Sequence, residues 1–185
     1  MAERFENGYA GHVAVVTGGG TGMGREMVRQ LTAQGCDVAT CDVIVDNLAE
    51  TVDICTKDGN PGAILTHIAD VSDETQVLSF RDAVAAWRPH VNVVFNNAGI
   101  GGGGSIMESD RTEWEKTFGV CWYGVYYNTR AFLPLLLKAP FGHVVNTSSV
   151  NGFWASLGPN TAHTAYSAAK FAVKGFTEAL ITDFR

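Results

Sequence analysis

The chain alternates short apolar runs with longer stretches in which apolar residues recur at helical spacing. VAVVT at 13–17 is apolar almost throughout and ends at glycines, which is typical of a strand buried on both faces of a sheet. Four further strands are predicted at 37–43, 63–69, 91–95 and 143–148. Strands that alternate with helices favour a parallel sheet with right-handed crossovers and helices on both faces. The pattern therefore predicts an α/β fold.

Residues that cap helix ends mark where two of the helices begin. Asp73 with Gln76, and Asp110 with Glu113, have the spacing of a capping box, in which two side chains satisfy free N–H groups at a helix start. The second box is expected to open a long helix that runs through Tyr126 towards residue 134. From about residue 164 onward the pattern is helical again.

Composition and charge narrow the classes of function. The 185 residues are 46% hydrophobic and 17% charged, which suits one globular domain with a sizeable core. A net charge of −6 disfavours nucleic acid as a partner, because phosphate contacts need clustered Lys and Arg. FLPLLL at 132–137 is far too short to span a membrane, and MAERFENGYAG at the start lacks the apolar centre of a signal peptide. We therefore expect a single cytoplasmic domain over 1–185.

The cysteines give no sign of a metal site or of a disulfide framework. Cys36, Cys41, Cys55 and Cys121 show no CxxC pairing. The sequence therefore predicts no bound metal and a reduced chain.

A glycine-rich segment, TGGGTGMG at 17–24, follows the first predicted strand. A helix comes next, because Met23, Met27 and Leu31 recur every four residues up to about Gly35. Free backbone N–H groups and the positive end of the helix dipole meet at such a point, so a phosphate can bind there. The spacing is G-x-x-x-G-x-G, which fits neither G-x-G-x-x-G nor a Walker A loop. Taken alone, the segment is equally compatible with a structural turn.

An acid at the end of the second predicted strand favours a dinucleotide in this loop. Asp42 stands 18 residues after Gly24, and a carboxylate there can accept both ribose hydroxyls of an adenosine while repelling a 2′-phosphate. No Arg or Lys lies inside the loop, where Thr21 stands, to bind such a phosphate. The sequence therefore predicts NAD as the cofactor in preference to NADP. A solvated aspartate at a strand end is the alternative.

Four motifs, in this order along the chain, resemble those of the short-chain dehydrogenase/reductase family, NAD(P)-dependent oxidoreductases on a Rossmann fold. They are the TGxxxGxG loop at 17–24, NNAG at 96–99, NTSS at 146–149 and YSAAK at 166–170. The resemblance covers essentially the whole chain and implies one NAD(P)-binding domain with a doubly wound parallel sheet. In that family two more strands and a substrate-covering loop follow, so the sheet looks truncated after its fifth strand and the next helix.

The resemblance also implies which residues bind the cofactor. The matching positions are Gly18, Thr21, Gly22, Met23, Gly24, Asp42, Asp70, Val71, Asn97, Gly99, Tyr166 and Lys170. Among them, Asp70 and Val71 match a pair that contacts adenine, and Asn97 and Gly99 lie in the segment that closes the fourth strand beside the cofactor. A homo-oligomer, dimer or tetramer, formed through the long helix and the last helix is implied in the same way.

Ser149, Tyr166 and Lys170 match the family's catalytic serine and YxxxK pair. A secondary alcohol and a ketone interconvert when a hydride moves to or from nicotinamide while a proton moves on oxygen. A tyrosine hydroxyl is a poor base at neutral pH, and an ammonium four residues along the same helix face favours its phenolate. Tyr166 would be the general acid and base, with Lys170 also holding the nicotinamide ribose and Ser149 binding the substrate oxygen. By spacing alone, the pair is more typical of a solvated face.

One position in the long helix departs from the family pattern. Aligned on Trp114, Phe118 and Gly124, the chain carries Cys121 where the family has an asparagine that holds a water on the proton relay to the lysine. A thiol is a weak donor and acceptor, and no Lys, Arg or His flanks it locally to make it reactive. We expect a small buried residue at this position and a weakened or rerouted relay. The alternative function is an NAD-binding sensor or partner subunit with little catalysis.

Two connections near the expected site are less informative. The glycine run at 101–104 is predicted to be a flexible loop. The connection before the last helix supplies Phe153, Trp154 and Leu157, which would form an apolar substrate wall or an ordinary packed loop. His163 in the same connection could assist proton transfer, although a plain loop histidine is the simpler interpretation.

Overall fold

Five parallel strands form one sheet in the part of the chain that the computed structural model describes, residues 8–108, 110–156, 158 and 161–184. The strands are β1 (Val13–Thr17), β2 (Asp37–Asp42), β3 (Ile64–Ile68), β4 (Val93–Asn96) and β5 (His143–Asn146). Their order across the sheet is β3-β2-β1-β4-β5. Chain order reverses between β1 and β4, which is the switch point of a doubly wound fold. The predicted Rossmann-like architecture is confirmed, with strand ends within two residues of the predicted bounds.

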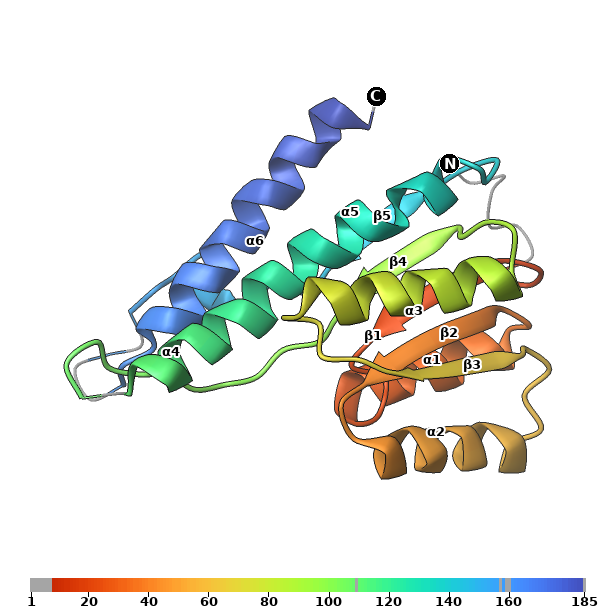
Figure 1. The fold of residues 1–185 in the computed structure, drawn as a ribbon, viewed down its shortest axis with the longest axis horizontal. Helices are drawn as coiled ribbons and strands as arrows, with labels where there is room; N and C mark the ends of the chain where they lie inside the picture. The colour runs from red at the N-terminus through yellow and green to blue at the C-terminus, as the bar shows by residue number, and fades with distance from the viewer. Residues whose placement is uncertain (1–7, 109, 157, 159–160, 185) are drawn as a thin grey trace.

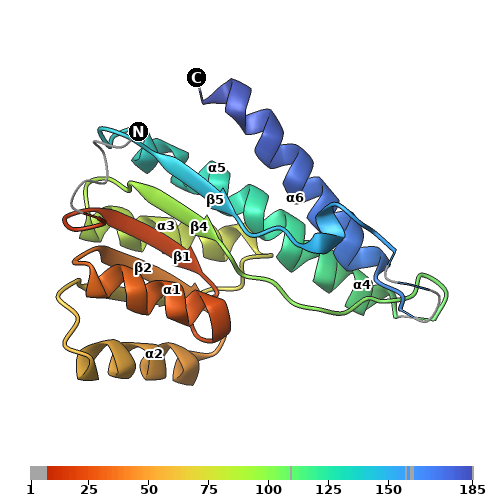
Figure 2. The same ribbon diagram turned by 180° about the vertical axis from the view of Figure 1, so that it is seen from behind.

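Helices cover both faces of this sheet. They are α1 (Gly22–Ala33), α2 (Val45–Lys57), α3 (Glu74–Trp87), α4 (Arg111–Phe118), α5 (Gly124–Leu136) and α6 (Thr164–Asp183), with a π-helical turn η2 (Gly119–Tyr123) and a 3-10 turn η3 (Val150–Gly152). Figures 1 and 2 show α3 and α5 on one face and α1 and α2 on the other. No capping residue marks the start of α2 in the sequence, because the residue before it, Ile44, has no side chain that can cap the helix.

The alternating faces of β1 explain the two hydrophobic cores. Val15 points to one face, where it joins a cluster with Phe80 of α3 and Phe132 of α5, whose ring centres are 5.4 Å apart. Val16 points to the other face and packs with Val28 of α1. Every residue of β1 is buried, because β1 has a strand on each side and helices above and below.

The predicted long helix is divided into α4, η2 and α5. A π-helical turn adds one residue to a helical turn and often lies at a functional site. At the start of α4, Asp110 caps the N–H of Thr112 at 3.3 Å. At the start of α3, Asp73 caps the N–H of Gln76 at 3.3 Å, but Gln76 Oε1 accepts from the N–H of Asp70 at 2.9 Å. This second bond ties α3 to the end of β3.

The carboxyl ends of all five strands lie at the same edge of the sheet, which is where ligands bind in doubly wound folds. The helix α4 and the start of α6 project beyond this edge (Figures 1 and 2). Among the helices that the structure describes, none is both long enough and apolar enough to cross a bilayer.

Candidate active site

The glycine loop after β1 takes a conformation that larger residues could not adopt. Gly18 has φ +70° and donates to Cys41 O at 2.8 Å, and a Cβ on it would lie 2.9 Å from the Cα of Ala98. Gly22 has φ +54°. A Cβ on Gly24 would overlap the carbonyl oxygen of Gly18, so α1 packs against the loop only because this residue is glycine. The loop therefore forms the tight turn that the sequence predicts.

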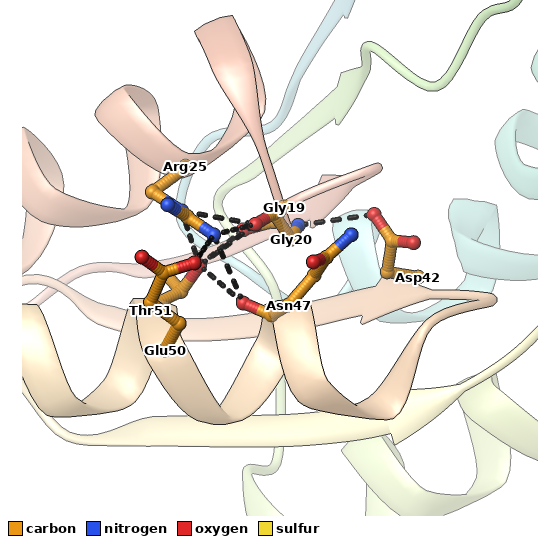
Figure 3. Close-up of polar contacts among 7 residues, drawn as sticks. All are labelled: Gly19, Gly20, Arg25, Asp42, Asn47, Glu50 and Thr51. Carbon is orange, nitrogen blue, oxygen red and sulfur yellow. Dashed lines mark hydrogen bonds and ion pairs between the residues drawn. The ribbon is translucent and has the colours of Figure 1, made fainter.

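The underside of the loop is bonded to two side chains that the sequence analysis did not identify (Figure 3). Arg25 donates to Gly20 O from Nε at 2.9 Å and to Glu50 Oε2 from Nη2 at 2.6 Å. Thr51, which is buried on α2, donates to Gly19 O at 2.9 Å. Arg25 stands directly after the last glycine, so its contact with the loop could have been predicted from the sequence. No nearby motif indicates that Thr51 contacts the loop. These loop carbonyls are held towards α2, and the first N–H groups of α1 have no partner within the helix.

Asp42 ends β2 beside the loop, as predicted. Its Oδ2 accepts from the N–H of Gly20 at 3.1 Å, and its Oδ1 accepts from the N–H of Ile44 at 3.1 Å (Figure 3). A Cβ on Gly20 would lie 2.7 Å from Asp42 Oδ2 and 2.8 Å from the Cβ of Asn47. The carboxylate is thus fixed at the loop, with further lone pairs on both oxygens for a ligand.

The residues after β3 and β4 have structural contacts in addition to their predicted role at the cofactor. Asp70 accepts from the hydroxyl of Ser72 at 2.7 Å, and Val71 is buried in a hydrophobic core. Asn97 donates from its N–H to Thr17 Oγ1 at 3.0 Å and from Nδ2 to Thr17 O at 3.1 Å. The side-chain amide of Asn97 therefore joins the end of β4 to the end of β1.

Lys170 lies at the centre of the candidate site. It is 2% exposed, and its Nζ donates to Thr147 O, directly after β5, at 2.7 Å. The same Nζ is 5.5 Å from the centre of the Tyr166 ring. Burial lowers the pKa of the Lys170 ammonium, and Cys121 acts on that pKa in the opposite direction. A Cβ on Gly99 would lie 3.7 Å from Lys170 Nζ and 3.8 Å from Cys121 Sγ, so these groups meet around one point.

Ser149 is placed by the turn η3, which packs against α6. Its Oγ accepts from the N–H of Asn151 at 3.2 Å, and the neighbouring Ser148 donates from Oγ to Lys170 O at 3.1 Å. A Cβ on Gly152 would lie 2.8 Å from that same Lys170 oxygen. The turn can approach α6 closely for this reason, and Ser149 comes to the part of α6 that carries the predicted tyrosine and lysine.

The glycine run at 101–104 is bonded to the start of α6, in place of the free loop that the sequence suggested. The N–H of Thr164 donates to Gly104 O at 2.8 Å, and the N–H of Ala165 donates to Gly103 O at 3.3 Å. Trp114 of α4 donates from Nε1 to Thr164 Oγ1 at 3.0 Å. These bonds supply partners for N–H groups at the start of α6, whose first residues lack a side-chain cap.

Cys121 is fully buried in η2, as predicted. Its Sγ donates to Ile100 O at 3.3 Å. No Lys, Arg or His lies next to Cys121 in the sequence. A lysine does lie beside the thiol, because α6 brings Lys170 to it from a distant part of the chain.

The connection before α6 presents apolar side chains to solvent. Phe153 and Trp154 are 67% and 70% exposed, and the ring centre of Phe153 lies 5.2 Å from Lys174 Nζ on α6. Leu157 lies outside the described residues. The rings of His163 and Tyr166 pack edge to face with centres 6.3 Å apart.

All four cysteines are buried free thiols. Within the ranges that the structure describes, no three His, Cys, Asp or Glu side chains are grouped to hold a metal ion.

Comparison with known proteins matches the chain to one family. A family model described as short chain dehydrogenase matches residues 12–185. SadH of Mycobacterium tuberculosis, which is named as an oxidoreductase, is 40% identical over 93% of the chain and 60% of its own length. Meso-2,3-butanediol dehydrogenase of Serratia marcescens is 36% identical over 97% of the chain and 66% of its own length. The chain thus spans about three fifths to two thirds of these relatives.

Solved structures give the same result. A short chain dehydrogenase/reductase of Burkholderia phymatum in complex with NAD has a TM-score of 0.85 and 37% identity, over 95% of the chain and 60% of that protein. A metagenomic short-chain oxidoreductase in complex with NADP has a TM-score of 0.84 and 30% identity, over 95% of the chain and 77% of that protein. The chain belongs to the short chain dehydrogenase family of oxidoreductases.

Proposed function

We propose that this chain is the catalytic part of an NAD-dependent oxidoreductase that interconverts a secondary alcohol and a ketone. The observation that carries the proposal is the buried ammonium of Lys170, fixed on Thr147 O at 2.7 Å beside the ring of Tyr166. A buried cation is costly, so its retention next to a tyrosine indicates a chemical role. The residues of this site stand at the same sheet edge as the glycine loop.

A nicotinamide dinucleotide fits the residues present. A Cβ at Gly18 or Gly24 would clash with neighbouring backbone atoms, so the loop can take this shape only with glycine at both positions. In this shape it offers the N–H groups at the start of α1 to a pyrophosphate. Asp42 offers its oxygens to the adenosine ribose, and Lys170 would hold the nicotinamide ribose. When bound, this cofactor supplies or accepts a hydride. Asp70, Val71, Asn97 and Gly99 would border it along the other strand ends, with Thr21, Gly22 and Met23 in the loop.

Asp42 and Arg25 together favour NAD over NADP. The carboxylate of Asp42 would repel a 2′-phosphate, and the guanidinium of Arg25 is occupied by Glu50 and Gly20 O beneath the loop. Titration with NADH and NADPH tests this preference. Tighter binding of NADH is expected, and tighter binding of NADPH would overturn it.

The proton is transferred by residues of this chain. In the reductive direction, Ser149 would hydrogen-bond the substrate carbonyl oxygen and Tyr166 would donate its hydroxyl proton to it. The Lys170 ammonium would stabilise the phenolate that remains, because opposite charges attract and Lys170 is buried beside the Tyr166 ring. In the oxidative direction the same phenolate accepts the proton from the alcohol.

The substrate is proposed to be a small apolar alcohol or ketone. The exposed rings of Phe153 and Trp154 lie in the connection that begins just after Ser149, where they could form an apolar wall. Two relatives carry names that indicate a secondary alcohol and a ketone as substrates, meso-2,3-butanediol dehydrogenase and levodione reductase.

NADH oxidation with a panel of ketones tests the proposal. Wild type should oxidise NADH in the presence of at least one ketone, and Tyr166→Phe should lose that activity while still binding NADH. Tyr127→Phe on α5 is a matched control that should retain it. Activity equal to background in all three proteins would contradict the proposal.

A second function, NAD binding without catalysis as a sensor or partner subunit, is favoured by one observation. Cys121 stands where the family's relay asparagine is expected. Tight NADH binding without turnover on any ketone would support this second function.

We further expect a cytoplasmic homo-oligomer, dimer or tetramer, built through α5 and α6 from one NAD(P)-binding domain over 1–185. Light scattering on the purified chain would give the mass. A monomer at micromolar concentration would contradict this expectation.

A further inference from the structure

Asn151 connects the two parts of the candidate site, the turn that follows Ser149 and the helix that carries Tyr166. No motif marks this residue, and the proposed function does not use it. It lies on η3, which follows Ser149, and it is only 7% exposed. Its Nδ2 donates to Ser167 Oγ on α6 at 3.0 Å, next to Tyr166 in the chain. Its Oδ1 accepts from the Ser149 hydroxyl at 3.5 Å. One buried amide therefore joins the turn with the serine to the helix with the tyrosine.

The orientation of this amide follows from its partners. A backbone carbonyl can only accept, so the bond of 3.2 Å between Ser167 Oγ and Ala155 O uses the hydroxyl proton of Ser167. The Ser167 oxygen must then accept from Asn151, which places the NH2 group of the amide on α6. The amide oxygen consequently faces Ser149.

This orientation determines how the Ser149 hydroxyl is held. The N–H of Asn151 donates to Ser149 Oγ at 3.2 Å, and the Ser149 proton points to Asn151 Oδ1 at 3.5 Å. The second bond is at the outer limit for a hydrogen bond and is therefore weak. A substrate oxygen could take over that proton at little cost, while the Ser149 oxygen stays in place.

We propose that Asn151 is a positioning residue: its amide, bonded to Ser167 of α6, holds the turn η3 and with it the Ser149 hydroxyl in place relative to Tyr166. This inference rests on the proposed function, because it concerns the reaction in which Ser149 binds the substrate oxygen. In this role Asn151 acts through Ser149 and not by contact with substrate or cofactor. Its effect should therefore reach the reaction only through Ser149, and should appear in kcat more than in KM.

A double-mutant cycle tests this dependence. The proteins are wild type, Asn151→Ala, Ser149→Ala and the double variant, each assayed for NADH-dependent reduction of one working ketone. Asn151→Ala should lower kcat by on the order of tenfold, because a serine displaced by a fraction of an ångström binds the substrate oxygen poorly. In the Ser149→Ala background the same change should lower kcat by less than about twofold, since the residue it positions is gone.

Two further variants separate positioning from general destabilisation. Asn60 donates from Nδ2 to Arg29 O and to Thr32 Oγ1, both at 2.9 Å, at the sheet edge opposite the site. Asn60→Ala also removes two hydrogen bonds donated by a side-chain amide, and it should leave kcat within twofold of wild type. Ser167→Ala removes the acceptor that orients Asn151 and should lower kcat less than Asn151→Ala does. Thermal unfolding and NADH affinity are measured for every variant.

The outcomes distinguish the inference from the function on which it rests. An active wild type in which Asn151→Ala lowers kcat equally with and without Ser149 would overturn the inference alone. The inference would also be overturned if kcat fell in proportion to the melting temperature in every variant, Asn60→Ala included. A wild type with no turnover on any ketone would overturn the proposed function, and with it this role of Asn151.

Discussion

Cys121 is the position at which the resemblance to the family implies an asparagine on the proton relay. Its thiol donates to Ile100 O at 3.3 Å and lies close to Lys170, but it cannot hold a water as a carboxamide does. We predict that Cys121→Asn raises kcat on a working ketone by several-fold, because the amide can complete a proton relay to Lys170. NADH affinity should not change. No gain in kcat, with NADH affinity unchanged and the variant folded, would show that the relay does not limit this protein.

Residues of the candidate site could be predicted from the sequence only where a motif marks them. Asp42 and the loop glycines were recognised, and the structure brings them together. Arg25 and Thr51 were missed, because side-chain bonds to loop carbonyls have no fixed spacing. The proximity of Cys121 to Lys170 was implied only by the resemblance, since it depends on how two helices cross.

At the scale of elements, the glycine run decides how α6 is attached. Gly103 has φ +55°, and a Cβ on it would lie 2.8 Å from Trp114 Cα and 2.9 Å from Ala165 Cβ. We predict that Gly103→Ala destabilises the protein by about 1–3 kcal/mol in urea unfolding. Gly101→Ala is the matched control, because nothing lies within 4 Å of its Cβ position, and it should cost less than about 0.5 kcal/mol. Equal losses for the two variants would contradict the tight packing at α6.

The cap of α3 predicts a pH dependence of stability. Asp73 accepts from the side chain and the N–H of Gln76, and these bonds lower the pKa of its carboxyl below the usual 3.8. A carboxyl with a lowered pKa in the folded state stabilises the fold above its unfolded pKa, and this contribution is lost as the pH falls through the folded pKa. We predict that Asp73→Ala lowers the melting temperature at pH 7, and that the difference from wild type narrows below about pH 4. A difference that stays constant down to pH 2 would refute this.

Helices and strands could be predicted where an apolar run or a capping residue marks their ends. β1 was predicted to the residue, because a strand buried on both faces is apolar along its length. The helix α2 had no cap and was missed. The π-helical turn at Gly119–Tyr123 was also missed, because it lies between two helices and no capping residue or proline marks it.

For the whole molecule, the most prominent surface feature away from the candidate site is an apolar groove beside β5. A cavity of about 510 Å³ lies between α5, β5 and α6. Its lining includes Leu133, Val144, Phe176 and Leu180. β5 pairs only with β4 among the described residues. The groove reaches α6 at Phe176 and Leu180, towards the C-terminal end of that helix, whereas Tyr166 and Lys170 lie nearer its start.

The proposed reaction is the transfer of a hydride from NADH to a ketone, with Tyr166 as the proton donor. The most direct measurement uses NADH carrying deuterium at the transferred position and follows the label into the alcohol by mass spectrometry. Wild type should place one deuterium on the carbinol carbon, and Tyr166→Phe should form less labelled alcohol by at least about a hundredfold at equal NADH occupancy. The absence of deuterium from the product of the wild-type protein, or equal labelling by both proteins, would contradict the claim.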